Sequence, residues 1–466
     1  MRYMGPFLRI NSLTEENIKN QLFHLSKEAM KHIVLNTGGG LTTSRKDFRI
    51  KDLHQSELSL IKGSYPLICI YRKAEPKISP DNKSLWDIKK LKKEVLIPSN
   101  AFMSLALLEL SDYYSKFKDL DEHKYSYCGL YAKLTKKQLQ FYYSYLRNDA
   151  GVFVDKINIA AEDENDLKFE NKCAEFKFSD QSFLMTAFYK ASLYEDKESE
   201  EFKNFSLDIL NMFKHYKDEL YKLSMDEIIK LALAFNIMYE YYKDEDVKCI
   251  LLDLLELIQE NYEESMLLQR RHKLENQCLC SLNYILFYKN TGILKFKDLY
   301  RNIYDSILNL YNKDLSLFIK DADKDKMVYS AEDINLYIMS LLPYNKFFTE
   351  GDSNSKSDEN HILINVFKKQ LVESGIILSW PEAPSLDDRE RYNKFSLNSE
   401  DLLDEDNFKM NSIPTPESIE LSPVFSKEVK FSERKGIFKT PKYSFYSEKN
   451  MFIFFLYIFL KNHGAF

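Results

Sequence analysis

The chain has 466 residues, of which 44% are hydrophobic, 14% aromatic and 29% charged, a composition typical of a folded globular protein. It contains only 12 glycines and 12 prolines, whereas average usage would give about 33 and about 23. This scarcity excludes an all-β sandwich, which needs frequent turns, and a glycine-rich nucleotide-binding fold over most of the length. The formal net charge of -6 lacks the basic excess expected of a nucleic-acid-binding protein.

The N-terminal segment, residues 1–97, is expected to be irregular apart from one helix. Apolar residues at helical spacing predict that helix over residues 14–35, and residues 66–71 predict a short strand. The first residues show no apolar run of a secretory signal, and the six scattered cysteines form no CxxC pair, so we expect a cytoplasmic protein. The abundance of Lys, Asn, Ile, Phe and Tyr indicates a bacterial source.

The stretch from Pro98 to Pro343 is expected to be helical throughout, because no proline and only three glycines lie between these two residues. Two kinds of helix alternate in it. Helices of the first kind contain long runs without charge and must be buried on more than one face; these runs are 95–108, 181–189, 231–239, 276–288 and 334–345. Helices of the second kind have one apolar stripe opposite charged residues; they cover 202–216, 247–262 and 299–311.

This alternation predicts an all-α fold of helical hairpins, in which a buried inner helix is followed by an amphipathic outer helix. The inner helices are expected to begin near Ser99, Asp180, Ser224, Glu275 and Ala331. Such hairpins build either a closed (α/α) toroid or an open solenoid. We favour the toroid over residues 98–377, because an open solenoid would expose one face of the charge-free inner helices to water.

Two of the predicted inner-helix starts carry a sequence signature of a capping box. Ser224 is followed three residues later by Glu227, and Ser330 is followed at the same spacing by Asp333. In a capping box the two side chains satisfy free backbone N–H groups at the start of the helix. We therefore expect helices to begin directly after both serines.

Residues 378–466 are predicted to be an extended polar tail that ends in a short apolar helix. Half of the prolines lie in this last part of the chain. The apolar run 451–460 (MFIFFLYIFL) is about half as long as a membrane-spanning helix. We therefore expect a buried terminal helix here and no membrane contact.

Residues 180–189 (DQSFLMTAFY) and 330–334 (SAEDI) each place an acidic residue at the start of an apolar helix. In this pattern, the chain resembles the (α/α) toroids of the six-hairpin glycosidase-like superfamily over about residues 97–374. The resemblance implies hydrolysis, lysis or epimerisation of a carbohydrate at one end of the ring, with a sixth hairpin built from residues 14–35 and 451–460. Tryptophans usually line the sugar-binding funnel of this group, whereas this chain has only two.

Asp180, Glu332 and Asp333 are the candidate catalytic residues. Glycoside hydrolysis needs one protonated carboxyl group as the acid and one carboxylate as the base or nucleophile. Further carboxylates lie at or near inner-helix starts: Asp149, Asp155, Asp226, Glu227 and Glu275. Each of these residues could instead cap a helix, because a carboxylate accepts hydrogen bonds from the free N–H groups of the first turn.

Neither a metal nor another cofactor is expected, because the eight histidines form no HxH or HExxH motif and no cluster with cysteine. The predicted ligand is a carbohydrate. The alternative function is a non-catalytic helical-repeat scaffold that binds a protein partner on an open concave surface. A closed ring of inner helices would favour the toroid, whereas an open superhelix would favour the scaffold.

Overall fold

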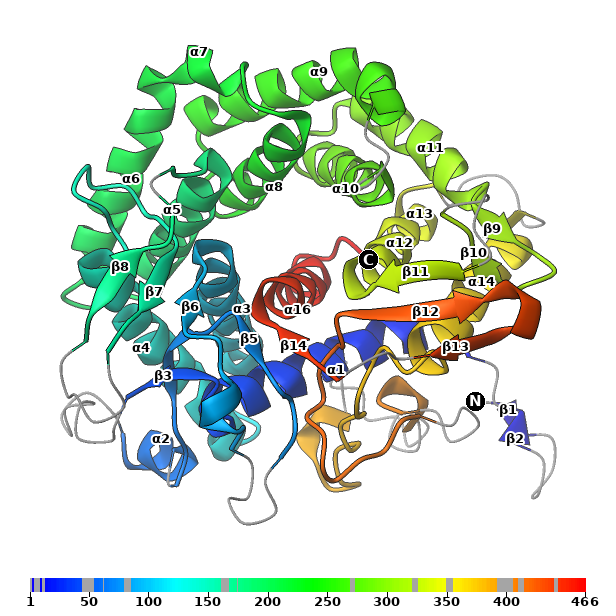
Figure 1. Ribbon diagram of the computed structural model, residues 1–466, viewed down its shortest axis with the longest axis horizontal. Helices are drawn as coiled ribbons and strands as arrows, with labels where there is room; N and C mark the ends of the chain where they lie inside the picture. The colour runs from blue at the N-terminus through cyan, green and yellow to red at the C-terminus, as the bar shows by residue number, and fades with distance from the viewer. Residues whose placement is uncertain are drawn as a thin grey trace.

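Six inner helices form a closed ring around the centre of the protein in the computed structural model (Figure 1). In chain order they are α3 (Ile97–Ser115), α5 (Phe178–Ser192), α8 (Met225–Tyr241), α10 (Lys273–Thr291), α12 (Ala331–Leu341) and α16 (Ser447–Asn462). Each inner helix packs against the next, and α16 packs against both α12 and α3. The contact between α16 and α3 closes the ring, so the predicted all-α toroid is confirmed and an open superhelix is excluded.

The structure describes residues 2–3, 9–10, 13–43, 54–61, 63–78, 85–160, 167–173, 175–268, 273–320, 326–348, 355–391, 405–409, 415–439 and 443–466. Short helices and strands at the periphery of the ring are α2 (Gln55–Leu60), α7 (Lys217–Leu220), α13 (Tyr344–Phe347), β1 (Arg2–Tyr3), β2 (Arg9–Ile10), β9 (Tyr311–Asn312) and β10 (Leu317–Phe318).

The outer layer supplies one helix for each inner helix. These partners are α4 (Glu122–Tyr145), α6 (Ser199–His215), α9 (Glu245–Leu268), α11 (Leu294–Leu308), α14 (Ser355–Val366) and α1 (Glu15–Asn36). The sixth pair joins the two ends of the chain, because α1 packs against α16. Thr14 starts α1 with a capping box, in which its Oγ1 accepts a hydrogen bond from the Asn17 backbone N at 3.1 Å.

Aromatic and amide side chains fill the space between neighbouring inner helices. The Phe102 ring of α3 contacts Phe183 of α5 and Phe452 of α16, with ring centroids 4.6 and 5.0 Å apart. Tyr457 of α16 donates a hydrogen bond at 2.9 Å to the Asn335 side chain of α12. Each inner helix is thus covered by two inner neighbours and by an outer helix, which explains why its sequence carries so few charges.

Short antiparallel strands lie at the end of the ring where the inner helices begin. One three-stranded sheet contains β6 (Glu94–Val95), β7 (Lys156–Asn158) and β8 (Phe169–Asn171). A second contains β11 (Lys326–Ser330), β12 (Glu428–Ser432) and β13 (Ile437–Lys439). Two further pairs of strands are β5 (Lys73–Ala74) with β14 (Phe445–Tyr446) and β3 (Gly40–Thr42) with β4 (Leu67–Ile70). Since β6, β11 and β14 each lead directly into an inner helix, these strands fix where the helices start.

The apolar run 451–460 is part of the ring. All ten of its residues are buried, because α16 lies between α3 and α12 and is covered on the outside by α1. The predicted buried terminal helix is confirmed, although it begins four residues earlier, at Ser447. Among the described residues, no helix is both long and apolar enough to cross a membrane.

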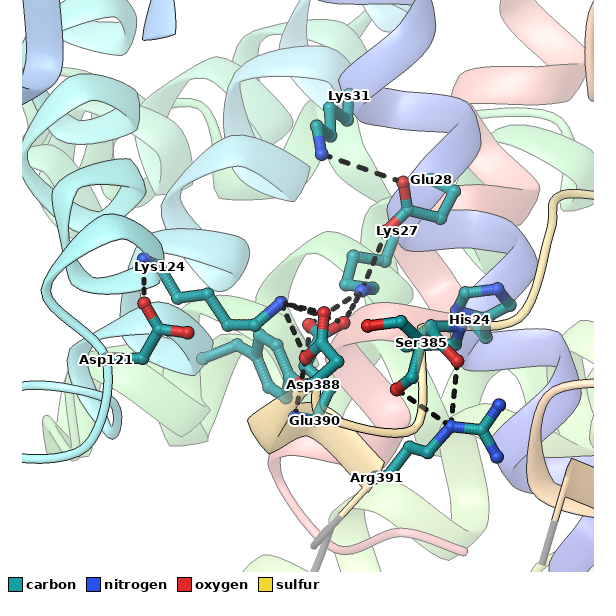
Figure 2. A network of polar contacts seen from close by, with 12 residues as sticks. His24, Lys27, Glu28, Lys31, Asp121, Lys124, Ser385, Asp388, Glu390 and Arg391 are labelled. Carbon is teal, nitrogen blue, oxygen red and sulfur yellow. Dashed lines mark hydrogen bonds and ion pairs between the residues drawn. The ribbon is translucent and has the colours of Figure 1, made fainter. Parts of the chain in front are cut away.

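A buried ionic network holds part of the C-terminal tail against the ring (Figure 2). The Lys27 ammonium of α1 contacts both carboxylate oxygens of Glu390 at 2.7 Å and Glu28 at 2.8 Å. Lys124 of α4 lies 2.9 Å from Asp388 and 3.5 Å from Glu390. Because Lys27 and Glu390 are almost completely buried, this network fixes the tail to two outer helices.

A second set of contacts holds a later part of the tail against α1. Gln21 donates a side-chain hydrogen bond at 2.6 Å to the backbone oxygen of Asp406. Trp380 donates from its indole nitrogen to the backbone oxygen of Phe408 at 3.0 Å, which ties two tail segments together. The described parts of the tail are therefore anchored on the ring.

Candidate active site

The N-terminal ends of the inner helices meet at one end of the ring, and most of them carry an acidic residue in the first turn. Five of these residues, which we call the mouth carboxylates, are Asp180, Glu227, Glu275, Glu332 and Glu448. Burial raises the pKa values of Asp180 and Glu332, and the charges of three of the other mouth carboxylates raise them further. The fold thus concentrates negative charge at the positive ends of the helix dipoles.

Asp180 is the most deeply buried mouth carboxylate, with 8% of its surface exposed. Among the described residues, none forms a hydrogen bond or ion pair with its carboxyl group. Burial raises the pKa of Asp180 well above its usual range, and the charge of Lys177 opposes this effect. Negative charges on Asp155, Glu227 and Glu448 raise the pKa further. This environment favours the protonated form of Asp180.

Glu332 lies in the first turn of α12, and its carboxylate forms an ion pair with Lys449 of α16. Burial raises the pKa of Glu332 to about 7, in spite of this lysine. The negative charges of Glu275 and Glu448 contribute to the same shift. A carboxyl group whose pKa lies near 7 is present in both protonation states at neutral pH, as general acid–base catalysis requires.

Glu448 influences both buried carboxyl groups. It is exposed at the start of α16, and its charge raises the pKa of Asp180 and of Glu332. Lys230, in the second turn of α8, lies among the same carboxylates. Burial lowers the pKa of Lys230, but Glu275 and Glu448 outweigh burial, so that the net shift is upward. The mouth therefore holds two protonatable carboxyl groups, an exposed carboxylate and a charged lysine.

Asp333, the third predicted catalytic residue, stabilises the start of α12. Its Oδ2 accepts hydrogen bonds at 2.7 Å from the Ser330 backbone N and from Lys320 Nζ. The Ser330 hydroxyl in turn accepts a hydrogen bond at 3.0 Å from the Asp333 backbone N. These contacts form the capping box that the sequence predicts, and they occupy Asp333 with the role of a capping residue.

Three of the other predicted carboxylates also hold helix ends. Asp155 accepts a hydrogen bond at 2.9 Å from the backbone N–H that begins α3. Glu227 accepts one at 2.8 Å from the Ser179 backbone N of α5, and Asp226 accepts one at 2.6 Å from a side-chain amide of α10. Asp149 is exposed on the turn after α4. Capping therefore accounts for Asp155 and Glu227, and a hydrogen bond between α8 and α10 accounts for Asp226, whereas Asp180 and Glu332 need another explanation.

Sequence reasoning missed Glu448, Lys449 and Lys230. The prediction begins the last helix at Met451, but α16 begins at Ser447, and its polar first turn carries two of these charges. The serine followed by charged residues and an apolar run is a helix-start signal that could have found them. Lys230 gave no such signal, because only the folded ring brings it among the carboxylates.

A second polar cluster lies at the opposite end of the ring, where the inner helices finish. Glu109 of α3, which is fully buried, accepts hydrogen bonds from Tyr241 Oη at 2.6 Å and from His463 Nε2 at 3.0 Å. His463 Nδ1 lies 3.2 Å from Glu240 Oε1. Burial lowers the pKa of His463, but the two carboxylates outweigh burial and raise it. Both carboxylates are paired, so this cluster joins the end of α16 to α3 and α8.

The fold and the site together define a closed (α/α) toroid with protonatable carboxyl groups at one mouth. Within the described ranges, no three His, Cys, Asp or Glu side chains form a group that could hold a metal ion. No protein-family model matches the sequence, and no curated protein is similar to it.

Two solved structures are similar to this chain in helical arrangement. A sugar epimerase from a ruminal bacterium has a TM-score of 0.44 and 11% sequence identity, over 76% of this chain and 87% of that protein. An endoglucanase from the termite Nasutitermes takasagoensis has a TM-score of 0.46 and 10% identity, over 96% of this chain and 99% of that protein.

Proposed function

We propose that this protein is a carbohydrate-processing enzyme that cleaves a glycosidic bond with the mouth carboxylates. The observation that carries the proposal is the pair of buried carboxyl groups with raised pKa values, Asp180 and Glu332, beside the exposed carboxylate of Glu448. Glycoside hydrolysis requires this combination of a protonated carboxyl group and an ionised one.

In this proposal, Glu332 is the general acid. Its pKa of about 7 leaves it able to give a proton to the leaving oxygen at neutral pH and to recover one afterwards. Glu448, which is exposed, is the carboxylate that activates water or attacks the sugar. Asp180 stays protonated and donates a hydrogen bond to a sugar hydroxyl. Lys449 and Lys230 limit the repulsion among the acidic groups.

The experiment is a screen of oligosaccharides with the wild type and the Glu332→Gln variant, in which products are measured by mass spectrometry. Glutamine has nearly the shape of glutamate but cannot donate the proton, so we expect a loss of about 100-fold or more in rate. The matched control is Asp333→Asn, which changes the next residue of the same helix. It should keep activity within about twofold. Full activity in Glu332→Gln would contradict the proposal.

The closed ring bears on the alternative function. An open concave surface for a protein partner is absent from the described part of the chain, since α16 joins α3. A closed toroid that binds a protein and has no activity would show no turnover in the same screen.

We also propose a cytoplasmic location in a bacterium, and the six free cysteines fit a reducing compartment.

A further inference from the structure

A cavity of about 630 Å³ lies beside the start of α16. Its size falls within the range of small-molecule binding sites. It is lined by residues from 73–77, by Lys90, by residues 427–428 and by residues from 443–446. The charged and aromatic lining residues are Lys73, Glu75, Lys77, Lys90, Lys427, Glu428, Tyr443 and Tyr446. Four lysines therefore face two glutamates, which leaves a local excess of positive charge in a chain whose net charge is -6.

The two lysines nearest to Tyr446 give the cavity its character. Lys73 Nζ lies 5.4 Å from the centre of the Tyr446 ring, and Lys427 Nζ lies 5.8 Å from it. Lys77 and Lys90 both pair with the single carboxylate of Glu75, and Lys427 also lies 3.6 Å from Glu428. One wall thus presents two ammonium groups around an aromatic ring, a combination suited to a sugar that carries an acidic group.

The cavity adjoins the mouth carboxylates. Strands β5 and β14 pair side by side next to the start of α16 (Figure 1), with Lys73 opposite Tyr446. Glu448, in the first turn of α16, follows Tyr446 by two residues, and two residues of backbone span at most about 7 Å. A carbohydrate chain with one residue at Glu448 could therefore place a neighbouring residue in the cavity.

We propose that the lysine cavity binds the acidic group of the substrate, so that the substrate is a carboxylated oligosaccharide such as a chain of uronic acids. This inference rests on the proposed function. Tyr443, which is 50% exposed, offers an aromatic face to a sugar ring, and Lys73 and Lys427, which lie over the Tyr446 ring, offer charge to the carboxylates.

Binding is tested by calorimetry at low ionic strength on the Glu332→Gln background, which prevents turnover. The probes are a galacturonate trimer, uncharged cellotriose and inorganic phosphate. The double change Lys73→Gln and Lys427→Gln should weaken binding of the trimer by about five- to tenfold, because each exposed charge pair contributes little alone. Added salt should weaken binding by the unaltered cavity. Lys313→Gln, which removes an exposed lysine elsewhere, is the control and should change nothing.

Three results would overturn the inference. The trimer could bind equally well to the double variant, cellotriose could bind as tightly as the trimer, or phosphate could displace the trimer at equal concentration. Turnover of neutral chains by the wild type, without binding of the trimer, would contradict the cavity assignment alone. Binding of the trimer, with no carbohydrate processed by the wild type, would contradict the proposed function and therefore the substrate assignment that rests on it.

Discussion

Replacing Glu390 by glutamine removes the carboxylate that neutralises Lys27 in the network of Figure 2. The Lys27 side chain is 2% exposed and the Glu390 side chain 4%, so the change leaves a buried ammonium group short of one partner. Removing one member of a buried ion pair costs about 3–5 kcal/mol in free energy of unfolding. Glu28 remains 2.8 Å from Lys27. We therefore expect the low end of that range, about 3 kcal/mol.

The reverse change, Lys27→Met, leaves the Glu390 carboxylate buried. Lys124 remains 3.5 Å away, so the expected cost is again about 3 kcal/mol. In the double variant, which combines Glu390→Gln with Lys27→Met, neither the carboxylate of residue 390 nor the ammonium of residue 27 is left. The glutamine that replaces Glu390 can still accept the hydrogen bond that Tyr113 donates at 3.2 Å. The double variant should lose only about 2 kcal/mol, much less than the sum of the single changes.

The assay is urea unfolding followed by circular dichroism and by tryptophan fluorescence. Trp380, buried in the anchored tail, reports on whether the tail leaves the ring before the helices unfold. The exposed pair of Lys295 and Glu256, 3.1 Å apart, provides the control, and Glu256→Gln should change stability by less than about 1 kcal/mol. Additive losses in the double variant, or single losses as small as this control, would refute the reasoning.

Three further predictions concern the two ends of the ring. The pKa of Glu332 is raised from 4.5 to about 7, so stability should fall by about 3 kcal/mol as pH rises from 4.5 through 7; urea unfolding of Glu332→Gln should not show this fall. Asp333→Asn loses the ion pair with Lys320 but can still cap α12, so its thermal unfolding should indicate a loss of about 1 kcal/mol; an unchanged melting temperature would contradict this. The pKa of His463 is raised in the folded protein, so the protonated ring stabilises the fold fully below pH 6.5, and this stabilisation is lost as pH rises through the higher folded pKa. His463→Gln should therefore lower the free energy of unfolding by about 2 kcal/mol at pH 6 and by less at high pH. Equal losses at the two pH values would contradict the pairing of His463 with the two carboxylates.

The helical ring could be predicted from the sequence because its signals are local. Charge-free runs exist where a helix is covered on several faces, and the predicted starts near Ser99, Asp180 and Ala331 lie within two residues of the observed ones. The short strand predicted over residues 66–71 is confirmed by β4. These features depend on the spacing of apolar residues and on the positions of helix-breaking residues, both of which can be read directly from the sequence.

Contacts between distant segments could not be read in the same way. The capping box predicted at Ser330 forms, but the one predicted at Ser224 is absent, because the Glu227 carboxylate bonds the Ser179 backbone N of the neighbouring helix instead. The same spacing thus has two outcomes, and tertiary packing decides between them.

The sequence predicts acidic residues at the starts of the inner helices, but not which of them come together. Acidic residues at inner-helix starts do gather at one mouth, including Asp180 and Glu332. Glu448 joins them only because α16 closes the ring beside α3, more than three hundred residues away in the chain. The pKa of Glu332 likewise depends on Glu275 and Glu448, which come from two other helices.

The central claim is that Glu332 is a general acid whose pKa is raised by burial and by the charges of neighbouring mouth carboxylates. The most direct test is the rate of glycoside cleavage as a function of pH, in the wild type and in Glu275→Gln, which removes a mouth carboxylate that takes no part in the proposed cleavage. We predict that the wild-type rate falls on the alkaline side with an apparent pKa of about 7. Because the charge of Glu275 raises the pKa of Glu332, the rate of Glu275→Gln should fall at lower pH. A rate that stays level through pH 7, or an alkaline limb that Glu275→Gln leaves in place, would contradict the account.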